Sequence, residues 1–194
     1  MYIKAYVSIN KGVIRQMNFP DKKYNIIYAD PAWSYSNKNT GGSMNSGSNA
    51  KYDTMTIQDI CNLNVSDISQ NDSFLFLWVT YPMLQEGLDV IKAWKFTYKT
   101  VAFTWVKKTK DNKDHFGMGF WTRANPEICL LAVKGKPKVK SHSVRQLTFA
   151  QIEEHSKKPH IIRDKIIELC GDLPRIELFA RERINGWDAW GNEI

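Results

Sequence analysis

Apolar residues in this chain form short blocks, separated by polar segments that contain Gly, Asn, Asp or Pro. Six blocks have the length and composition of β-strands: residues 2–9, 26–29, 74–79, 100–106, 127–133 and 176–180. The block at 2–9 alternates in part between apolar and polar side chains, which predicts an edge strand. The block at 74–79 is apolar throughout, which predicts a central strand.

Three further segments have the features of helices: residues 57–62, 82–94 and 160–169. Thr56 is a suitable N-cap for the first helix, with Asp59 at a capping-box spacing, and Gly171 ends the last. The middle helix carries apolar side chains at helical spacing: Leu84, Leu88 and Ile91. Because the expected strands and helices alternate, we predict an α/β fold with a mostly parallel central sheet flanked by helices.

Residues 36–51 are rich in Gly, Ser and Asn and contain almost no apolar side chains, which predicts a mobile loop. Long loops in compact domains are often functional, and this one directly follows the strand at 26–29, so we expect a lid over a site. No repeat or linker divides the chain, and 194 residues suffice for one core. We therefore predict a single domain over residues 1–194.

The clearest candidate chemistry lies where the strand at 26–29 ends, in the sequence Asp30-Pro31-Ala32-Trp33. Pro31 disfavours helical geometry at Asp30, so the carboxylate is expected at the sheet edge where α/β proteins bind ligands. The Asp30 carboxylate and the Pro31 carbonyl could accept both N–H groups of an amine on a flat ring, and Trp33 could stack on that ring. The exocyclic amine of adenine fits this arrangement. The alternative is a simple turn in which Trp33 belongs to the core.

The net charge of +7 is concentrated in one part of the sequence. Residues 107–145, the basic window, contain ten basic and three acidic residues, so the rest of the chain is balanced. Such a concentration predicts a surface for a polyanion such as nucleic acid, and the alternative is a solvated loop.

The three cysteines, Cys61, Cys129 and Cys170, are widely spaced in apolar surroundings, which favours free thiols in a reducing compartment. The four histidines lack partners at metal-ligand spacing, so no metal site is expected. No apolar run approaches the about 18 residues that span a bilayer, and the N-terminal residues lack the apolar core of a signal peptide. We therefore expect a cytoplasmic protein that does not insert into membranes.

The sequence resembles the MT-A70 type adenine-N6 methyltransferases, whose motif Asp-Pro-Pro-Trp is matched by residues 30–33 with Ala32 in place of the second proline. Further stretches match the family in the same order and spacing: residues 52–55, 72–80, 105–107, 131–135, 155–159, 175–181, 186–187 and 191–192. Their combination covers most of the chain and is far more specific than any one motif.

This resemblance implies a Rossmann-like, S-adenosylmethionine-dependent methyltransferase fold with permuted motif order, in which the cofactor strand comes last and lacks a glycine-rich fingerprint. The implied catalytic residues are Asp30, Pro31 and Trp33. The implied cofactor-binding residues are Asp30, Lys158, Arg181, Arg183, Asn192 and Glu193. Lys158 would pair with the methionine carboxylate, although without the resemblance it would be taken for a surface charge. The family usually has His at the position of Arg183 and Gln at that of Glu193.

On the substrate side, the resemblance and the charge pattern together select Trp33, Tyr52, Lys107, Lys108 and Arg123. We expect transfer of a methyl group to the N6 amine of adenine in nucleic acid, and in DNA rather than RNA, because residues 155–159 look like the microbial and phage branch of the family. The alternatives are an RNA adenine-N6 methyltransferase, a catalytically silent nucleic-acid-binding subunit and a small-molecule methyltransferase. The sequence leaves open whether the chain acts alone, as a homo-oligomer or with a partner subunit.

Overall fold

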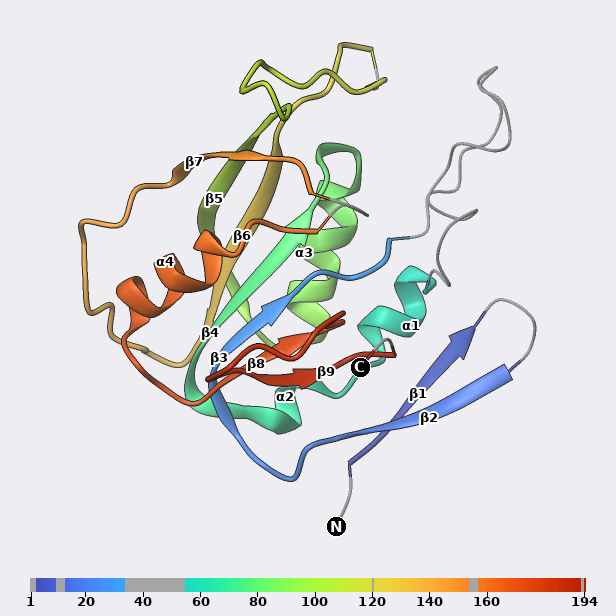
Figure 1. Cartoon of the computed structure of the whole chain (residues 1–194). Helices are drawn as coiled ribbons and strands as arrows, with labels where there is room; N and C mark the ends of the chain where they lie inside the picture. Colours follow the sequence, from blue (N-terminus) through green and yellow to red (C-terminus); the bar gives the residue numbers. More distant parts are fainter. Residues whose placement is uncertain (1–2, 10–12, 34–54, 120, 154–156, 193) are drawn as a thin grey trace.

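The computed structural model describes residues 3–9, 13–33, 55–119, 121–153, 157–192 and 194, with side chains from Asn18 onward (Figure 1). Its centre is a seven-stranded sheet in the order β7-β5-β6-β4-β3-β8-β9. The strands are β3 (Tyr24–Ala29), β4 (Ser69–Val79), β5 (Thr97–Lys108), β6 (Glu127–Lys134), β7 (Leu147–Gln151), β8 (Arg175–Leu178) and β9 (Asp188–Trp190). Only β6 runs antiparallel to its neighbours among these seven strands. The predicted α/β fold with a mostly parallel sheet is confirmed.

Helices cover both faces of this sheet (Figure 1). They are α1 (Ile57–Cys61), α2 (Val65–Ile68), α3 (Leu84–Ala93), α4 (Ile161–Cys170) and the short 3-10 helix η2 (Tyr81–Met83). Leu75, Leu77 and Val79 of β4 share one buried cluster with α1 and α3. Phe76 and Trp78 point to the opposite face and pack in the cluster of α4. The continuous apolar run of β4 therefore supplies two cores, because alternate side chains of a strand face opposite sides.

Several sequence predictions for single elements are confirmed. Thr56 caps α1 by accepting the backbone N–H of Asp59 at 3.1 Å, and Gly171 ends α4 with a φ of 91°. Cys129 and Cys170 are buried free thiols, and Cys61 is partly buried and also free. No helix among the described residues is both long and apolar enough to cross a membrane.

Other predictions need correction. The strand expected at 2–9 is present as β1 (Ile3–Ile9), but it pairs with β2 (Val13–Phe19) in a separate hairpin and not at the edge of the central sheet. In α3 the buried side is formed by Gly87, Val90 and Ile91, whereas Leu84 is exposed. A Cβ at Gly87 would lie 2.5 Å from Val79 Cγ1, so the helix approaches β4 through its glycine.

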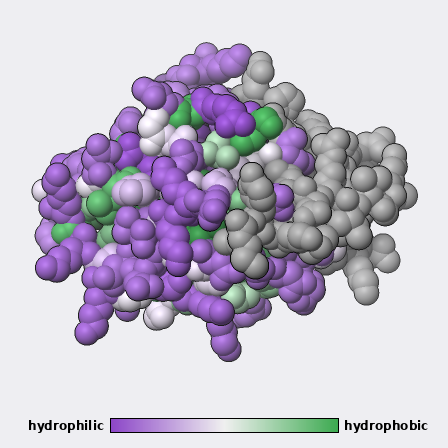
Figure 2. Space-filling view, turned by 90° about the horizontal axis from the view of Figure 1, so that it is seen from below, coloured by the Kyte–Doolittle hydropathy of each residue, from purple (hydrophilic) through white to green (hydrophobic). Residues whose placement is uncertain are grey.

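The sheet brings distant parts of the sequence to one edge. Since every strand of the sheet except β6 runs in the same direction, β3, β4, β5, β7, β8 and β9 all end at this edge, whereas β6 begins there. We call it the carboxyl edge. The opposite end of the sheet, viewed in Figure 2, has a mainly hydrophilic described surface.

Candidate active site

The chain leaves β3 through a turn that backbone hydrogen bonds hold in place. The N–H of Asp30 lies 3.5 Å from the last carbonyl of β8, and the N–H of Trp33 donates to the Pro31 carbonyl at 2.9 Å. The N–H of Met55, just before α1, donates to the carbonyl of Ala32 at 3.3 Å. Asp30 is thereby fixed at the carboxyl edge, where the sequence predicts it.

Trp33 is a core residue in this structure. It is 6% exposed, and its indole N–H donates to the Trp78 carbonyl at 3.0 Å. These contacts support the alternative raised from the sequence, in which the indole anchors the turn. Stacking of Trp33 on a substrate ring stays a prediction.

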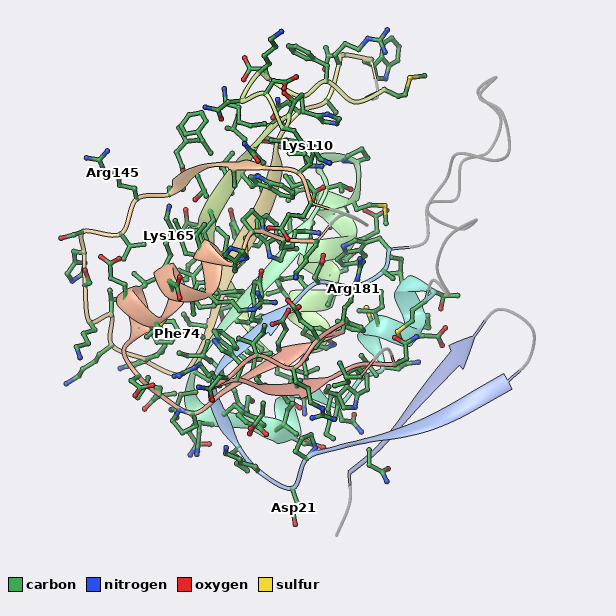
Figure 3. All side chains as sticks on the ribbon, in the orientation of Figure 1. Asp21, Phe74, Lys110, Arg145, Lys165 and Arg181 are labelled. Carbon is green, nitrogen blue, oxygen red and sulfur yellow. The ribbon has the colours of Figure 1, made fainter. Side chains whose placement is uncertain are left out.

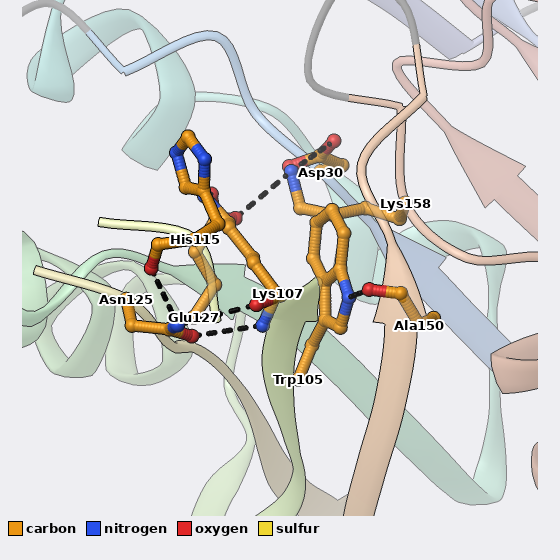
Figure 4. Close-up of polar contacts among 8 residues, drawn as sticks. All are labelled: Asp30, Trp105, Lys107, His115, Asn125, Glu127, Ala150 and Lys158. Carbon is orange, nitrogen blue, oxygen red and sulfur yellow. Dashed lines mark hydrogen bonds and ion pairs between the residues drawn. The ribbon is translucent and has the colours of Figure 1, made fainter. Parts of the chain in front are cut away.

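Four side chains of alternating charge form a partly buried cluster around Asp30 (Figure 4). The Lys158 ammonium lies 2.9 Å from Asp30 Oδ2 and 3.2 Å from Glu127 Oε2. The other oxygen of Glu127 accepts from Lys107 Nζ at 2.5 Å. The side chains of Lys158 and Glu127 are each 10% exposed, so both charges are largely removed from water. We call these four residues the charge cluster.

Opposite charges keep the buried members of the cluster ionised. Burial lowers the pKa of Lys158, but the carboxylates of Asp30 and Glu127 outweigh this effect and hold the pKa above its ordinary value. Burial raises the pKa of Glu127, but the charges of Lys158 and Lys107 outweigh it and hold the pKa below its ordinary value. At neutral pH Lys158 and Glu127 are therefore both charged, in spite of their burial.

Hydrogen bonds that involve β5 and β7 anchor the cluster on the sheet. Asn125 accepts the backbone N–H of Lys107 at 2.8 Å and donates to the Lys107 carbonyl at 3.2 Å and to the His115 carbonyl at 2.5 Å (Figure 4). Trp105 donates its indole N–H to the Ala150 carbonyl of β7 at 2.9 Å, which ties β5 to the strand that leads towards Lys158. The side-chain positions in the cluster thus depend on β3, β5, β6 and β7 together.

Two predicted cofactor residues lie in segments that approach each other after β8 and β9. The N–H of Ala180 donates to the Trp190 carbonyl at 3.0 Å, and a Cβ at Gly191 would lie 2.3 Å from the Ala180 carbonyl oxygen. This close approach places Arg181 and Asn192 in neighbouring segments at the carboxyl edge.

The remaining predicted positions are less directly placed. Arg183 is exposed. Glu193 and Tyr52 lie outside the described residues, as does the expected lid at 36–51. The roles of these residues stay predictions.

The structure divides the basic window between two ends of the sheet. Lys134, the last residue of β6, pairs in register with Ser73 in the first half of β4, so the segment that follows β6 lies at the end opposite Asp30. Figure 3 shows the spread, with Lys110 at one end of the molecule and Arg145 at its side. Only the first part of the window, the basic residues from Lys107 to Arg123, can therefore act beside Asp30.

The predicted substrate residues in that first part differ in their surroundings. Lys107 belongs to the charge cluster, and Lys108 pairs with Asp114 at 2.7 Å. Arg123 is exposed on the loop between β5 and β6, with its guanidinium 3.7 Å from the thioether sulfur of Met118. Of the three, Arg123 is the best placed to reach a ligand outside the fold.

Sequence reasoning missed Glu127 and Asn125. Both are ordinary polar residues on either side of Pro126, and only the pairing of β5 with β6 brings them to Lys107. The available signal in the sequence was an acidic residue at the first position of a run that is otherwise apolar and expected to be buried. The structure also shows a buried pair that the sequence did not indicate, in which Arg163 donates to both oxygens of Glu177 at 2.7 and 2.9 Å.

The chain is similar in sequence to several known methyltransferases. The chain is 37% identical over 191 residues to the type II methyltransferase M.MunI of Mycoplasma sp. This alignment covers 90% of the chain and 79% of that protein. It is 27% identical over 177 residues to the human N(6)-adenosine-methyltransferase catalytic subunit METTL3 and 27% identical over 176 residues to the Arabidopsis thaliana N(6)-adenosine-methyltransferase MT-A70-like. These two alignments cover 89% and 88% of the chain, but only 28% and 24% of the relatives.

The model of one family, MT-A70, matches residues 24–193. That range contains the turn at Asp30, the charge cluster and the adjoining ends of β8 and β9. The chain therefore belongs to the MT-A70 family.

Proposed function

We propose that this protein transfers a methyl group from S-adenosylmethionine to the exocyclic N6 amine of adenine in nucleic acid, and that its substrate is DNA. The observation that carries the proposal is the placement of Asp30, in the family motif at 30–33, at the carboxyl edge with its carboxylate bound by Lys158 at 2.9 Å. DNA is favoured over RNA because the 37% identical relative is a type II methyltransferase matched over most of both chains. The relatives named for adenosine methylation are less similar and are matched over about a quarter of their length.

The residues at the carboxyl edge fit S-adenosylmethionine. Lys158 and Asp30 offer an ammonium and a carboxylate side by side, which suits the oppositely charged ends of an amino acid. Arg181 and Asn192, brought together by the contact of Gly191 with Ala180, offer donors for ribose oxygens. When bound, S-adenosylmethionine supplies a methyl group on a positively charged sulfur that an amine lone pair can attack in line.

The protein's part in the reaction is to hold the target amine. Lys158 binds Asp30 Oδ2, and we assign the other carboxylate oxygen to one N–H of the amine. The Pro31 carbonyl already accepts the N–H of Trp33, but a carbonyl oxygen has a second lone pair for the other N–H of the amine. Two fixed acceptors favour a tetrahedral nitrogen with its lone pair directed at the methyl group, and such positioning is a major source of rate enhancement. The product loses its proton to water.

Transfer of a labelled methyl group to adenine-containing DNA and RNA tests this proposal. Asp30→Asn keeps the size of the side chain but exchanges one acceptor for a donor, so we expect methylation to fall by about 10²-fold or more. Asp172→Asn is the matched control, because Asp172 is exposed at the opposite end of the sheet, next to Arg175, and should leave the rate unchanged. Circular dichroism checks that both variants are folded.

Each outcome separates the candidate functions. Full activity of Asp30→Asn would refute the role of the carboxylate. Faster methylation of RNA than of DNA would assign RNA as the substrate. Nucleic-acid binding without methylation by the unmodified protein would identify a silent binding subunit, and salt-insensitive substrate binding would favour a small molecule.

A further inference from the structure

The loop between β5 and β6, residues 109–126, presents apolar side chains to solvent. Phe116 is 68% exposed, Met118 85% and Trp121 fully exposed. In Figure 1 this loop projects beyond the carboxyl edge, past the ends of both strands. A group of large apolar side chains exposed on one protruding loop marks a binding surface, because water contact with such side chains is unfavourable.

The backbone of the loop holds Trp121 in an uncommon conformation. Its φ is 68°, a region that bulky residues rarely occupy. Gly119 has a φ of 61°, and a Cβ there would lie 1.8 Å from the carbonyl oxygen of Thr122, so only glycine fits. Folding gains no burial from the indole in exchange for this conformation. The tight turn therefore points to a role for the exposed indole in binding.

The base of the loop is fixed to the charge cluster. The N–H of Gly117 donates to the Ala124 carbonyl at 2.6 Å and closes the tip. Asn125 then binds the His115 carbonyl and the backbone of Lys107, whose ammonium contacts Glu127 in the cluster (Figure 4). The tip is thus held at a defined position relative to Asp30.

The charges beside the tip favour nucleic acid as its ligand. Lys110, Lys113 and Arg123 are exposed on the loop. Of its two acids, Asp114 is paired with Lys108, which leaves Asp111 opposed to three cations. Cations that bind phosphates next to aromatic side chains that stack on bases are the usual combination for gripping unstacked nucleic acid.

We propose that the tip of this loop, with Trp121 as its main contact and Phe116 and Met118 beside it, stacks against the bases next to the target adenine. This inference rests on the proposed function. An adenine in a duplex must leave the base stack before its amine can reach Asp30, and the bases it leaves behind expose their faces. An indole on a loop whose base is anchored to the charge cluster covers such a face, with Arg123 on the adjoining phosphate.

Substitution of Trp121 tests the inference by DNA binding and by methylation of double-stranded and single-stranded DNA. We expect Trp121→Ala to weaken duplex binding about 10-fold to 100-fold, as loss of one stacked base does, and to slow methylation of duplex more than that of single strands. Trp121→Phe should restore most of the affinity, because a phenyl ring also stacks. Tyr98→Ala is the matched control, since Tyr98 is an exposed aromatic residue at the far end of β5 and should leave binding unchanged.

Further measurements separate this inference from the proposed function. Arg123→Gln should reduce the slope of log affinity against log salt concentration by about one, whereas Trp121→Ala should leave that slope unchanged. If the unmodified protein methylates DNA but Trp121→Ala binds and methylates it equally well, the inference is wrong and the proposed function stands. If Trp121→Ala instead breaks up a homo-oligomer, with DNA affinity per assembled unit unchanged, the tip is a protein interface and the inference is overturned.

Discussion

Replacement of Glu127 by Gln removes one charge from the cluster around Asp30 and keeps the size of the side chain. Glu127 contacts two ammonium groups, with Lys158 Nζ at 3.2 Å and Lys107 Nζ at 2.5 Å. The variant leaves Lys158 with Asp30 as its one carboxylate partner in the cluster, and Lys107 with none in it. Since the side chain of Lys158 is 10% exposed, solvent replaces the lost interaction poorly.

The size of the effect follows from these distances. Two unit charges at 3.2 Å attract by about 5 kcal/mol at an effective dielectric constant of about 20, and the cost of removing the ions from water offsets part of this attraction. Removal of one partner from a buried ion pair typically costs about 3–5 kcal/mol, because the other charge stays buried. Gln keeps a carbonyl oxygen that can accept from one Lys, so we expect a loss of about 2–4 kcal/mol in the free energy of unfolding.

Urea unfolding at pH 7, followed by tryptophan fluorescence, measures this loss. The matched control is Glu153→Gln, because Glu153 is 40% exposed and its nearest oxygen is 3.9 Å from Lys157, a geometry worth at most about 0.5 kcal/mol. An unchanged denaturant slope shows that both variants unfold from a comparable native state. If Glu127→Gln and Glu153→Gln lose the same stability, the cluster does not contribute as argued here.

The pH dependence gives a second check on the same residue. The folded-state pKa of Glu127 lies below its ordinary value of 4.5, so its ionised form stabilises the fold above that pH and the contribution is lost as the pH falls through the lowered pKa. Protonated Glu resembles Gln. The stability difference between the unmodified protein and Glu127→Gln should therefore be constant above about pH 5 and shrink at lower pH. A difference that grows on acidification would contradict the reasoning.

Two further substitutions test other parts of the fold. Arg163→Met should lower the free energy of unfolding by about 3–5 kcal/mol in urea titrations, because it leaves the buried Glu177 carboxylate without its Arg163 partner. Burial raises the pKa of Glu177 even beside its partner, and combining Arg163→Met with Glu177→Leu should recover most of the loss. Gly191→Ala places a Cβ 2.3 Å from the Ala180 carbonyl oxygen and should cost about 1–3 kcal/mol and weaken S-adenosylmethionine binding in calorimetry. Gly117→Ala, with its nearest contact at 3.3 Å, is the stability control and should cost less than Gly191→Ala, because a smaller shift relieves the contact.

The elements that the sequence predicts well are those whose own residues determine them. The apolar run of β4 has to be buried on both faces, and Thr56 and Gly171 set helix ends through local hydrogen bonds and backbone geometry. β7 was missed because Leu147 and Phe149 are exposed and their alternation with polar residues is too short to distinguish from a loop. That strand is held by its pairing with β5, which no local pattern reports.

In the candidate active site, too, features that local residues determine could be predicted, and features that depend on strand pairing could not. The Asp30 turn could be predicted because Pro31 and the preceding strand determine it locally. The pairing of Lys158 with Asp30 joins residues 128 positions apart, and the role of Glu127 depends on β6 running against its neighbours. The basic window predicted one charged surface for the same local reason. Its residues are continuous in sequence, but β6 carries the chain across the sheet and divides them between two ends.

Ala32, where the family motif has a second proline, can now be explained through its backbone. A second proline would stiffen the turn by fixing φ at position 32. Here the Ala32 carbonyl accepts the N–H of Met55, and Trp33 on the other side bonds to Pro31 and, through its buried indole, to the Trp78 carbonyl. These contacts restrain the residues on both sides of Ala32 without a proline ring. The rigidity that holds the Asp30 carboxylate and the Pro31 carbonyl as a pair of acceptors is therefore supplied by tertiary hydrogen bonds, and a proline at this position is dispensable for the proposed chemistry.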